Sequence, residues 1–287
     1  MREPAHAVGS PRVAKSDGVV VIAHPDDEIF ASGTLCLLAE KGFRIALVSV
    51  TDGENGSREL LRHVVPEVPL GTIRRRELAL SAWALGVTEV AYLGREDIPP
   101  ERWGSGNCLD QGCLVSTLAE IIRQADPKLI LTHGPHGGYG HPAHKEVYRC
   151  VMAAARDVAF AGSVFSFAAQ VGHAFFSWRF DQPSDVLIDA RCFFRRRMAS
   201  LCYHQSQSEF FLTPYAPRNI RNLLSVMFGF AFSFTEAGRK RVPIMTPDRF
   251  FNRFPVEGLA LQATGGERGP HFFQEHFSDD ARVRIIV

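Results

Sequence analysis

Hydrophobic residues along roughly the first 160 positions follow two alternating patterns. Short, continuous apolar runs are typical of strands buried on both faces, and they occupy 18–23, 44–51, 87–93 and 128–132. Apolar residues at helical spacing follow each run, at 27–41, 72–85, 114–125 and 144–157. These strand–helix alternations predict an α/β fold with a Rossmann-like, doubly wound and mostly parallel sheet, whose crossovers are right-handed.

The pattern becomes irregular after Gly162. One further strand is predicted at 185–188 and one further helix at 191–203, and the remaining chain is rich in Phe and Pro. Phe doublets stand at 210–211, 250–251 and 272–273. We interpret them first as satellite core beneath loops. The alternatives are an apolar lid for an acyl-bearing substrate or the interface of a homo-oligomer.

These patterns divide the chain into three parts. Residues 1–17 form a predicted disordered leader, and 18–207 form the α/β domain. Residues 208–287 form an irregular, Phe-rich C-terminal extension, which we expect to belong to the same globule, with a substrate lid as the alternative role.

Composition narrows the classes of protein. The chain has 287 residues, of which 46% are hydrophobic, enough for one sizeable core. Its 32 Lys and Arg against 31 Asp and Glu leave no basic field to bind nucleic acid. The Arg clusters at 74–76 and 195–197 favour a solvated helix face.

Three further features bear on where the protein is located. The apolar stretch at 223–234 is shorter than the ~20 residues that span a bilayer, so we expect no transmembrane segment. The leader lacks the apolar core of a secretion signal. Six cysteines without a Cys-x-x-Cys pair favour a reducing compartment, and we expect a cytoplasmic protein.

Two polar motifs follow predicted strands. Residues 24–28 read His-Pro-Asp-Asp-Glu directly after the first apolar run, and 141–144 read His-Pro-Ala-His after the fourth run and a Gly-rich loop. Ligands collect at the carboxyl ends of the strands in doubly wound sheets. The two motifs together therefore predict a metal site at that edge.

The residue types fit a hydrolytic metal centre. His24 and Asp27 can converge on one ion, with His141 or His144 as third ligand and one position open for water. Asp26 is then a carboxylate placed to accept a proton from that water, and the histidine that does not bind metal can stabilise an oxyanion. The alternative is an ordinary helix start with Asp26 as N-cap.

These motifs resemble those of the PIG-L/LmbE-type N-acetylglucosaminyl deacetylases. The first motif, at 23–28, is followed by Gly-Thr-Leu at 33–35, and the second spans 137–144. The helix and strand between them are similar to the family pattern, and a weaker likeness at 204–207 extends the resemblance over roughly 18–207.

The resemblance implies a metal-dependent deacetylase domain and a role for each matching residue. The implied zinc ligands are His24, Asp27 and His144, although iron(II), cobalt or nickel would also suit such a set. Asp26 matches the general base and His141 the residue that polarises the amide carbonyl. The implied substrate contacts are Arg74, Asp97 and His204, each with an ordinary structural role as its alternative; for Arg74 this is an exposed helix charge.

The sequence departs from the family pattern at two positions. Ala143 stands where a carboxylate is usual, which leaves the protonation state of His141 open. Arg197 stands where many relatives have lysine, and the two cations are not interchangeable at a specific contact.

The function implied is a zinc-dependent hydrolase that removes an N-acyl group, expected to be N-acetyl, from an amino sugar of a small-molecule glycoside or glycoconjugate. One alternative is a metal-dependent amidase or esterase acting on a non-sugar substrate. A second is a non-catalytic α/β binding module, although the Gly-x-Gly-x-x-Gly turn of nucleotide-binding folds is missing after the first strand.

Overall fold

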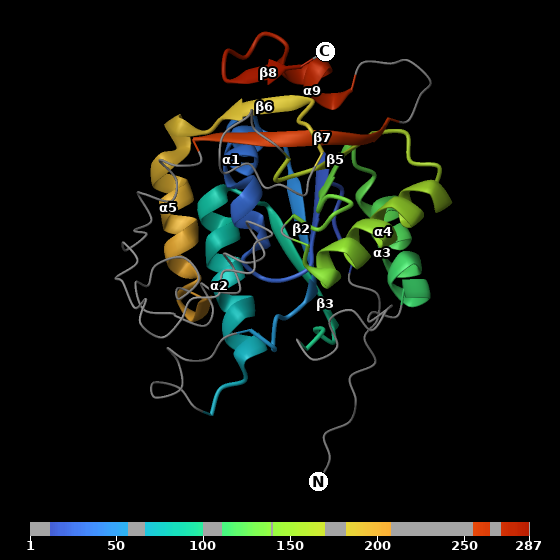
Figure 1. Cartoon of the computed structure of the whole chain (residues 1–287), viewed down its shortest axis with the longest axis vertical. Coiled ribbons are helices and arrows are strands. Elements are labelled where there is room, and N and C mark those ends of the chain that lie inside the picture. Colours follow the sequence, from blue (N-terminus) through green and yellow to red (C-terminus); the bar gives the residue numbers. More distant parts are fainter. Residues whose placement is uncertain are drawn as a thin grey trace, which may run out of the picture.

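The fold is known from a computed structural model, which describes residues 12–56, 67–99, 111–138, 140–169, 182–207, 255–264 and 271–286. These residues form an eight-stranded sheet in the order β3-β2-β1-β4-β5-β7-β6-β8 (Figure 1). The strands are β1 (Gly18–Ile22), β2 (Ile45–Thr51), β3 (Glu89–Arg95), β4 (Leu129–Thr132), β5 (Ser163–Ser166), β6 (Val186–Asp189), β7 (Val256–Thr264) and β8 (Val283–Ile285).

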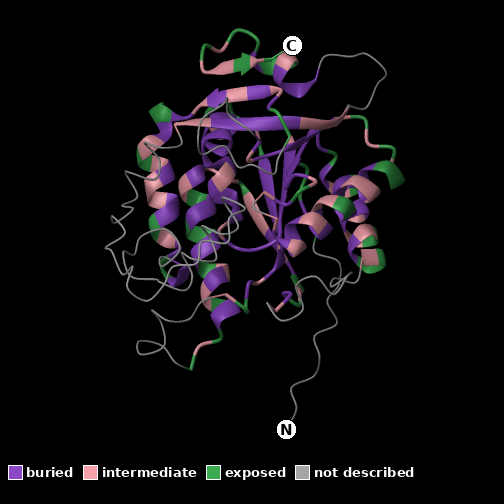
Figure 2. Ribbon diagram, in the orientation of Figure 1, coloured by how far each residue is buried: buried purple, intermediate pink, exposed green. Residues whose placement is uncertain are grey.

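Helices cover both faces of the parallel part of the sheet. Helices α1, α2 and α5 lie on one side and α3 and α4 on the other (Figure 1). Their bounds are α1 (Ser32–Glu40), α2 (Leu70–Leu85), α3 (Gln111–Ala125), α4 (Pro142–Asp157) and α5 (Phe194–Tyr203). Every residue of β1, β2 and β4 is buried, as the continuous apolar runs predict (Figure 2). The predicted α/β fold with a doubly wound, mostly parallel sheet is confirmed.

The order of the strands places a switch point at β1. The chain runs from β1 to β2 and β3 in one direction, and then returns to β4 and β5 on the other side of β1. Strands β3, β2, β1, β4 and β5 pair in parallel. Connections diverge at such a point and leave room for a ligand beyond the carboxyl ends of the strands. Both polar motifs lie at this edge.

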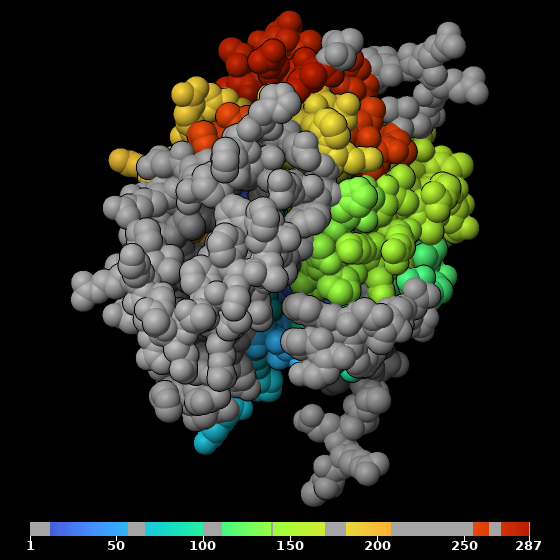
Figure 3. Space-filling view, in the orientation of Figure 1, coloured from blue at the N-terminus to red at the C-terminus, as the bar shows by residue number. Residues whose placement is uncertain are grey.

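The sheet continues with chain that the sequence pattern left irregular. Strand β7 lies between β5 and β6 and pairs antiparallel with both, and β8 pairs antiparallel with β6. Figure 3 shows these C-terminal elements packed against the segment at 182–207. One sheet therefore includes strands from either side of residue 207. The division of the chain there stays a prediction.

The Phe272-Phe273 doublet belongs to the core. It opens α9 (Phe272–Phe277), and both rings are buried. Phe272 packs on Phe43 at 5.2 Å between ring centroids, and Phe273 packs on Phe165 at the same separation. This doublet fits the satellite-core interpretation. The doublets at 210–211 and 250–251 lie outside the described residues, and the lid interpretation of the extension stays a prediction.

The buried carboxylate of Glu257 connects β7 with the start of α1 and with α5. Glu257 of β7 accepts hydrogen bonds from the backbone N–H groups of Gly33 and Thr34, at 2.7 and 2.8 Å. Arg197 of α5 lies 3.2 Å from the same carboxylate. The prediction of a solvated helix face is therefore wrong for Arg197, because a carboxylate distant in sequence compensates its charge.

No helix among the described residues is long and apolar enough to cross a bilayer.

Candidate metal centre and active site

The polar groups of the site come from the ends of several strands. His24 follows β1, Asp97 follows β3, and His133 follows β4. His141 and His144 lie at the start of α4, which the Gly-rich loop after β4 delivers to the same edge. Asp27 opens a 3-10 helix, Asp27–Ala31, that leads from β1 into α1. The two motifs, more than a hundred residues apart, therefore meet in space.

Asp27 lies among three imidazoles. Its Oδ1 is 3.1 Å from His144 Nε2, and its Oδ2 is 3.4 Å from His24 Nδ1 and 3.5 Å from His133 Nε2. Burial raises the pKa of Asp27, but the facing imidazoles of His144 and His133 outweigh burial and hold it well below its ordinary value. The carboxylate is therefore ionised at the centre of the cluster.

His24 is held between two carboxylates. Its Nε2 lies 3.0 Å from Asp97 Oδ1, while its Nδ1 faces Asp27. Burial lowers the pKa of His24, but hydrogen bonds to Asp27 and Asp97 more than compensate and raise the pKa to about 10. The two carboxylates thus stabilise a positive charge at His24, and a divalent cation bound to Nδ1 would also supply that charge.

Asp97 orients this imidazole. A histidine that binds metal through one ring nitrogen commonly donates its other N–H to a carboxylate, and Asp97 occupies that place. Burial raises the pKa of Asp97, while the hydrogen bond to His24 prevails and lowers it. Its backbone N–H donates to Glu54 Oε1 at 2.8 Å. The predicted contact between Asp97 and a sugar stays a prediction beside this observed contact.

The donor atoms fall into two overlapping sets. The ligand atoms of His24, His141 and His144 lie within 4.8 Å of one another, as do those of Asp27, His133 and His144. The predicted ligands combine both sets, and Asp27 contacts each of the other two. Imidazole nitrogen and carboxylate oxygen suit zinc and similar divalent ions. The residues present therefore fit a metal.

His133 is engaged elsewhere. Its Nε2 accepts a 2.9 Å hydrogen bond from the backbone N–H of Ala23, so the lone pair that faces Asp27 is occupied. Burial and then the charge of His144 lower the pKa of His133 to about 4, which keeps it neutral. Its ring stacks on His144 at 4.0 Å between centroids. These contacts suit a group that positions His144 rather than a ligand.

His141 has its proton placed by the helix. As N-cap of α4 it accepts the backbone N–H of Ala143 on Nδ1, at 3.2 Å. In the neutral ring this assigns the proton to Nε2, which is then a hydrogen-bond donor. Burial and then the charge of His144 hold the pKa of His141 well below its ordinary value. The backbone N–H of Ala143 thus fixes the tautomer of His141, although Ala143 lacks the carboxylate that is usual in the family.

Arg74 holds the loop that carries Asp26. Asp26 has a left-handed backbone, with φ 117°, which is uncommon outside glycine. Arg74 Nη2 lies 3.0 Å from Asp26 Oδ2 and also donates to the carbonyl of Pro25, while Nη1 donates to the carbonyl of Gly53 at 2.8 Å. Burial raises the pKa of Asp26 to about 6, against the opposing charge of Arg74. Because Arg74 is buried, its interpretation as an exposed helix charge is wrong.

His204 lies behind the loop. It is fully buried, and its Nε2 contacts Glu28 Oε1, which also accepts a hydrogen bond from Ser81. Glu28 Oε2 in turn accepts the backbone N–H of Asp26 at 3.0 Å. This position fits the structural alternative for His204 better than a contact with substrate. The supporting role of Ser81 has no signal in the sequence, since an isolated serine on a helix is ordinary.

The fold and this cluster define the protein as an α/β protein whose strand ends carry a buried histidine–aspartate site suited to a divalent metal ion. Residues 19–155 match the family model described as PIG-L, GlcNAc-PI de-N-acetylase. A 1D-myo-inositol 2-acetamido-2-deoxy-alpha-D-glucopyranoside deacetylase from Acidothermus cellulolyticus is 30% identical over 243 residues, which cover 66% of this chain and 78% of that protein. The chain belongs to the PIG-L family of deacetylases, which are hydrolases.

Other relatives give the same family with shorter overlap. A protein of the same description from Thermomonospora curvata is 36% identical over 163 residues, which cover 48% of this chain and 52% of that protein. The chain therefore spans about half the length of this relative.

Solved structures show the fold alone. An N,N'-diacetylchitobiose deacetylase from Pyrococcus horikoshii aligns with a TM-score of 0.56 at 17% identity, over 91% of this chain and 88% of that one. A 4-carboxy-2-hydroxymuconate hydratase from Pseudomonas putida aligns with a TM-score of 0.56 at 18% identity, over 90% of this chain and all of the other. Since a hydratase shares the fold, the fold does not decide the reaction.

Proposed function

We propose that this protein is a zinc-dependent N-deacetylase that acts on an N-acetylated amino sugar in a small-molecule glycoside or glycoconjugate. The observation that carries the proposal is the placement of Asp27 between His24 and His144, with Asp26 beside it on a loop held by Arg74. The names of the relatives support an amino-sugar substrate.

The metal is assigned to His24, Asp27 and His144. A divalent cation bound there would act as a Lewis acid and would lower the pKa of a bound water from about 15.7 to roughly 7. The donor set suits zinc, and iron(II), cobalt and nickel are the alternatives. Asp97 keeps Nδ1 of His24 directed toward Asp27, and the stacked ring of His133 supports His144.

The remaining residues move the proton and stabilise charge. Asp26 accepts a proton from the attacking water as the new C–O bond forms at the amide carbon. Nε2–H of His141 donates a hydrogen bond to the carbonyl oxygen as negative charge develops on it. Asp26 then gives the proton to the nitrogen as the C–N bond breaks. The products are acetate and the free amine.

A substrate panel tests the proposal against its rivals. The purified full chain, loaded with zinc, is assayed for amine release from the acetamido-glucosyl inositol named for the relatives and from N,N'-diacetylchitobiose. Matched non-sugar acetamides and O-acetyl sugars are assayed in parallel. We expect hydrolysis of an N-acetyl sugar at the highest kcat/KM. Preference for a non-sugar amide or an ester would favour the amidase or esterase, and stoichiometric metal without hydrolysis of any substrate would favour a binding module.

Arg74→Lys separates a positioning role from a substrate contact. Lysine cannot reproduce the fork that engages Asp26 and two backbone carbonyls, so Asp26 should be displaced. We expect kcat to fall about tenfold to a hundredfold, with KM within about twofold and metal content unchanged. Arg76→Lys, at an exposed position of the same helix, is the matched control. A raised KM with normal kcat would instead support the predicted contact between Arg74 and the substrate hydroxyls.

A further inference from the structure

We propose that the pocket between Phe30 and Phe167 receives the acyl group of the substrate, and that these two rings limit the acyl length that the enzyme accepts. This inference rests on the proposed deacylase function. It extends that function by assigning each half of the amide to one side of the site, and by naming the acyl group as the substituent that the enzyme distinguishes.

The side chains at the edge of the sheet are polar on one side of the metal centre and aromatic on the other. Asp97, after β3, closes one side, with Glu54 and Asn55 bonded to its backbone. On the other side His133 follows β4 and Phe167 follows β5. Phe167 contacts the His133 ring edge-on at 4.9 Å between centroids. One side of the site therefore offers carboxylates and an amide, and the other offers an aromatic wall.

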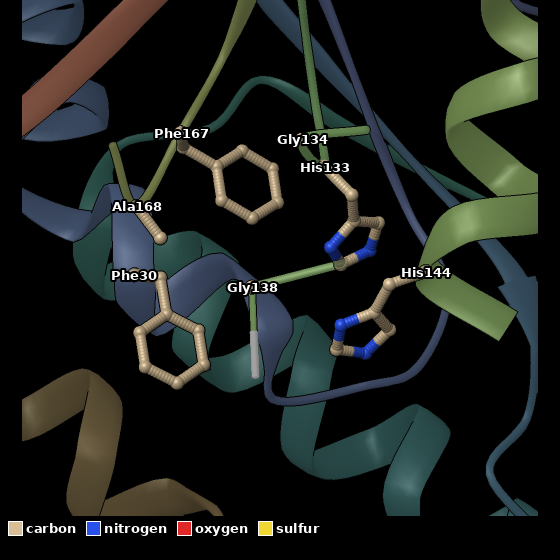
Figure 4. A pocket seen from close by; sticks show the side chains of 7 residues that line it. All are labelled: Phe30, His133, Gly134, Gly138, His144, Phe167 and Ala168. Atoms are coloured by element: carbon tan, nitrogen blue, oxygen red, sulfur yellow. The ribbon is translucent and has the colours of Figure 1, made fainter. Parts of the chain in front are cut away.

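The pocket opens directly beside the proposed metal ligand. Its walls comprise His133 and His144 on one side and Phe30, Phe167 and Ala168 on the other, as Figure 4 shows. Gly134 and Gly138 complete the lining and contribute no side chain. The cavity volume is about 10 Å³, which is room for a group about the size of one water molecule, such as the methyl of an acetyl group.

The chemistry of the lining matches an acyl group. His133 Nε2 accepts a hydrogen bond from the backbone N–H of Ala23, so this ring nitrogen is already engaged outside the pocket. The opposite wall is apolar, and apolar surface gains most from covering carbon rather than hydroxyl groups. The acyl carbon and the amide nitrogen diverge from the trigonal carbonyl carbon, so they occupy different sides of the site. With the carbonyl at the metal centre, the hydroxyl-rich amine half faces Asp97 and the acyl half enters the pocket.

The test compares acyl lengths on one sugar. N-acetyl-, N-butanoyl- and N-hexanoyl-glucosaminides are assayed with the zinc-loaded wild type, Phe30→Ala and Phe167→Leu. Phe30 is half-buried, and its variant should be the better folded of the two, since Phe167 is buried. We expect each variant to raise the hexanoyl-to-acetyl ratio of kcat/KM by about tenfold or more.

Phe43→Leu is the matched control, because Phe43 packs on Phe272 and Phe277 away from the pocket. It should leave the acyl ratio unchanged. If the wild type cleaves N-acyl sugars but neither pocket variant changes the ratio relative to this control, the acyl assignment is overturned and the deacylase function stands. If the wild type cleaves none of the amides, the proposed function fails, and the acyl assignment fails with it.

Discussion

Replacing Asp26 by asparagine is expected to lower kcat by on the order of a hundredfold or more while the protein still binds metal. Asparagine keeps the shape of the side chain and an oxygen that can accept from Arg74, but it cannot take up and return a proton. Because Asp27 rather than Asp26 contacts the imidazoles of His24 and His144, metal binding should persist.

Single-turnover amine release and metal analysis on the same sample give both quantities for this variant. Asp52→Asn is the matched control, since Asp52 pairs with Arg75 at 2.6 Å on the surface of α2 rather than with the metal cluster. Full activity of Asp26→Asn would remove Asp26 from the mechanism. Loss of metal together with activity would make Asp26 a ligand or a residue that holds one.

Asp27→Ala is expected to abolish both metal binding and hydrolysis. The change removes the only carboxylate that faces three imidazoles among the described residues, so a cation would lose its charge compensation. Bound zinc, measured after dialysis against a metal buffer, should fall from about one per chain to near zero. Treatment of the wild type with a chelator should give the same inactive state, and added zinc should restore activity only to the wild type.

The ligand variants also decide which members of the two overlapping donor sets bind the metal. His144 belongs to both sets, so His144→Ala should lose metal in either case. If His24, Asp27 and His144 are the ligands, Asp27→Ala loses metal whereas His141→Ala keeps it and loses activity. If His141→Ala loses metal whereas Asp27→Ala keeps it, His141 is a metal ligand and Asp27 is not. His136→Ala, at an exposed position of the loop after β4, is the control and should change neither quantity.

Much of the site was predictable because strand ends in a parallel sheet meet at one edge. The position of His24 after the first apolar run, and of His141 and His144 after the fourth, was enough to bring them together. The rest depends on partners distant in the chain. No local pattern indicates that Arg74 turns inward to Asp26 or that His204 lies behind Glu28, because those partners come from other elements.

The sequence by itself determined four of the five parallel strands, their helices and the meeting of the two motifs, whereas β5 lies where the pattern becomes irregular. Local hydrophobic periodicity indicates which face of an element is buried, and a continuous apolar run indicates a strand that is buried on both faces. Such elements can therefore be located without knowing which segments they pack against. Only the tertiary structure decided the insertion of β7 between β5 and β6, the burial of Arg197 against Glu257, and the tautomers of His133 and His141. The physical reason is that a strand partner, a buried counter-ion and the N–H that fixes a ring nitrogen are set by which segments pack together, and periodicity does not encode that choice.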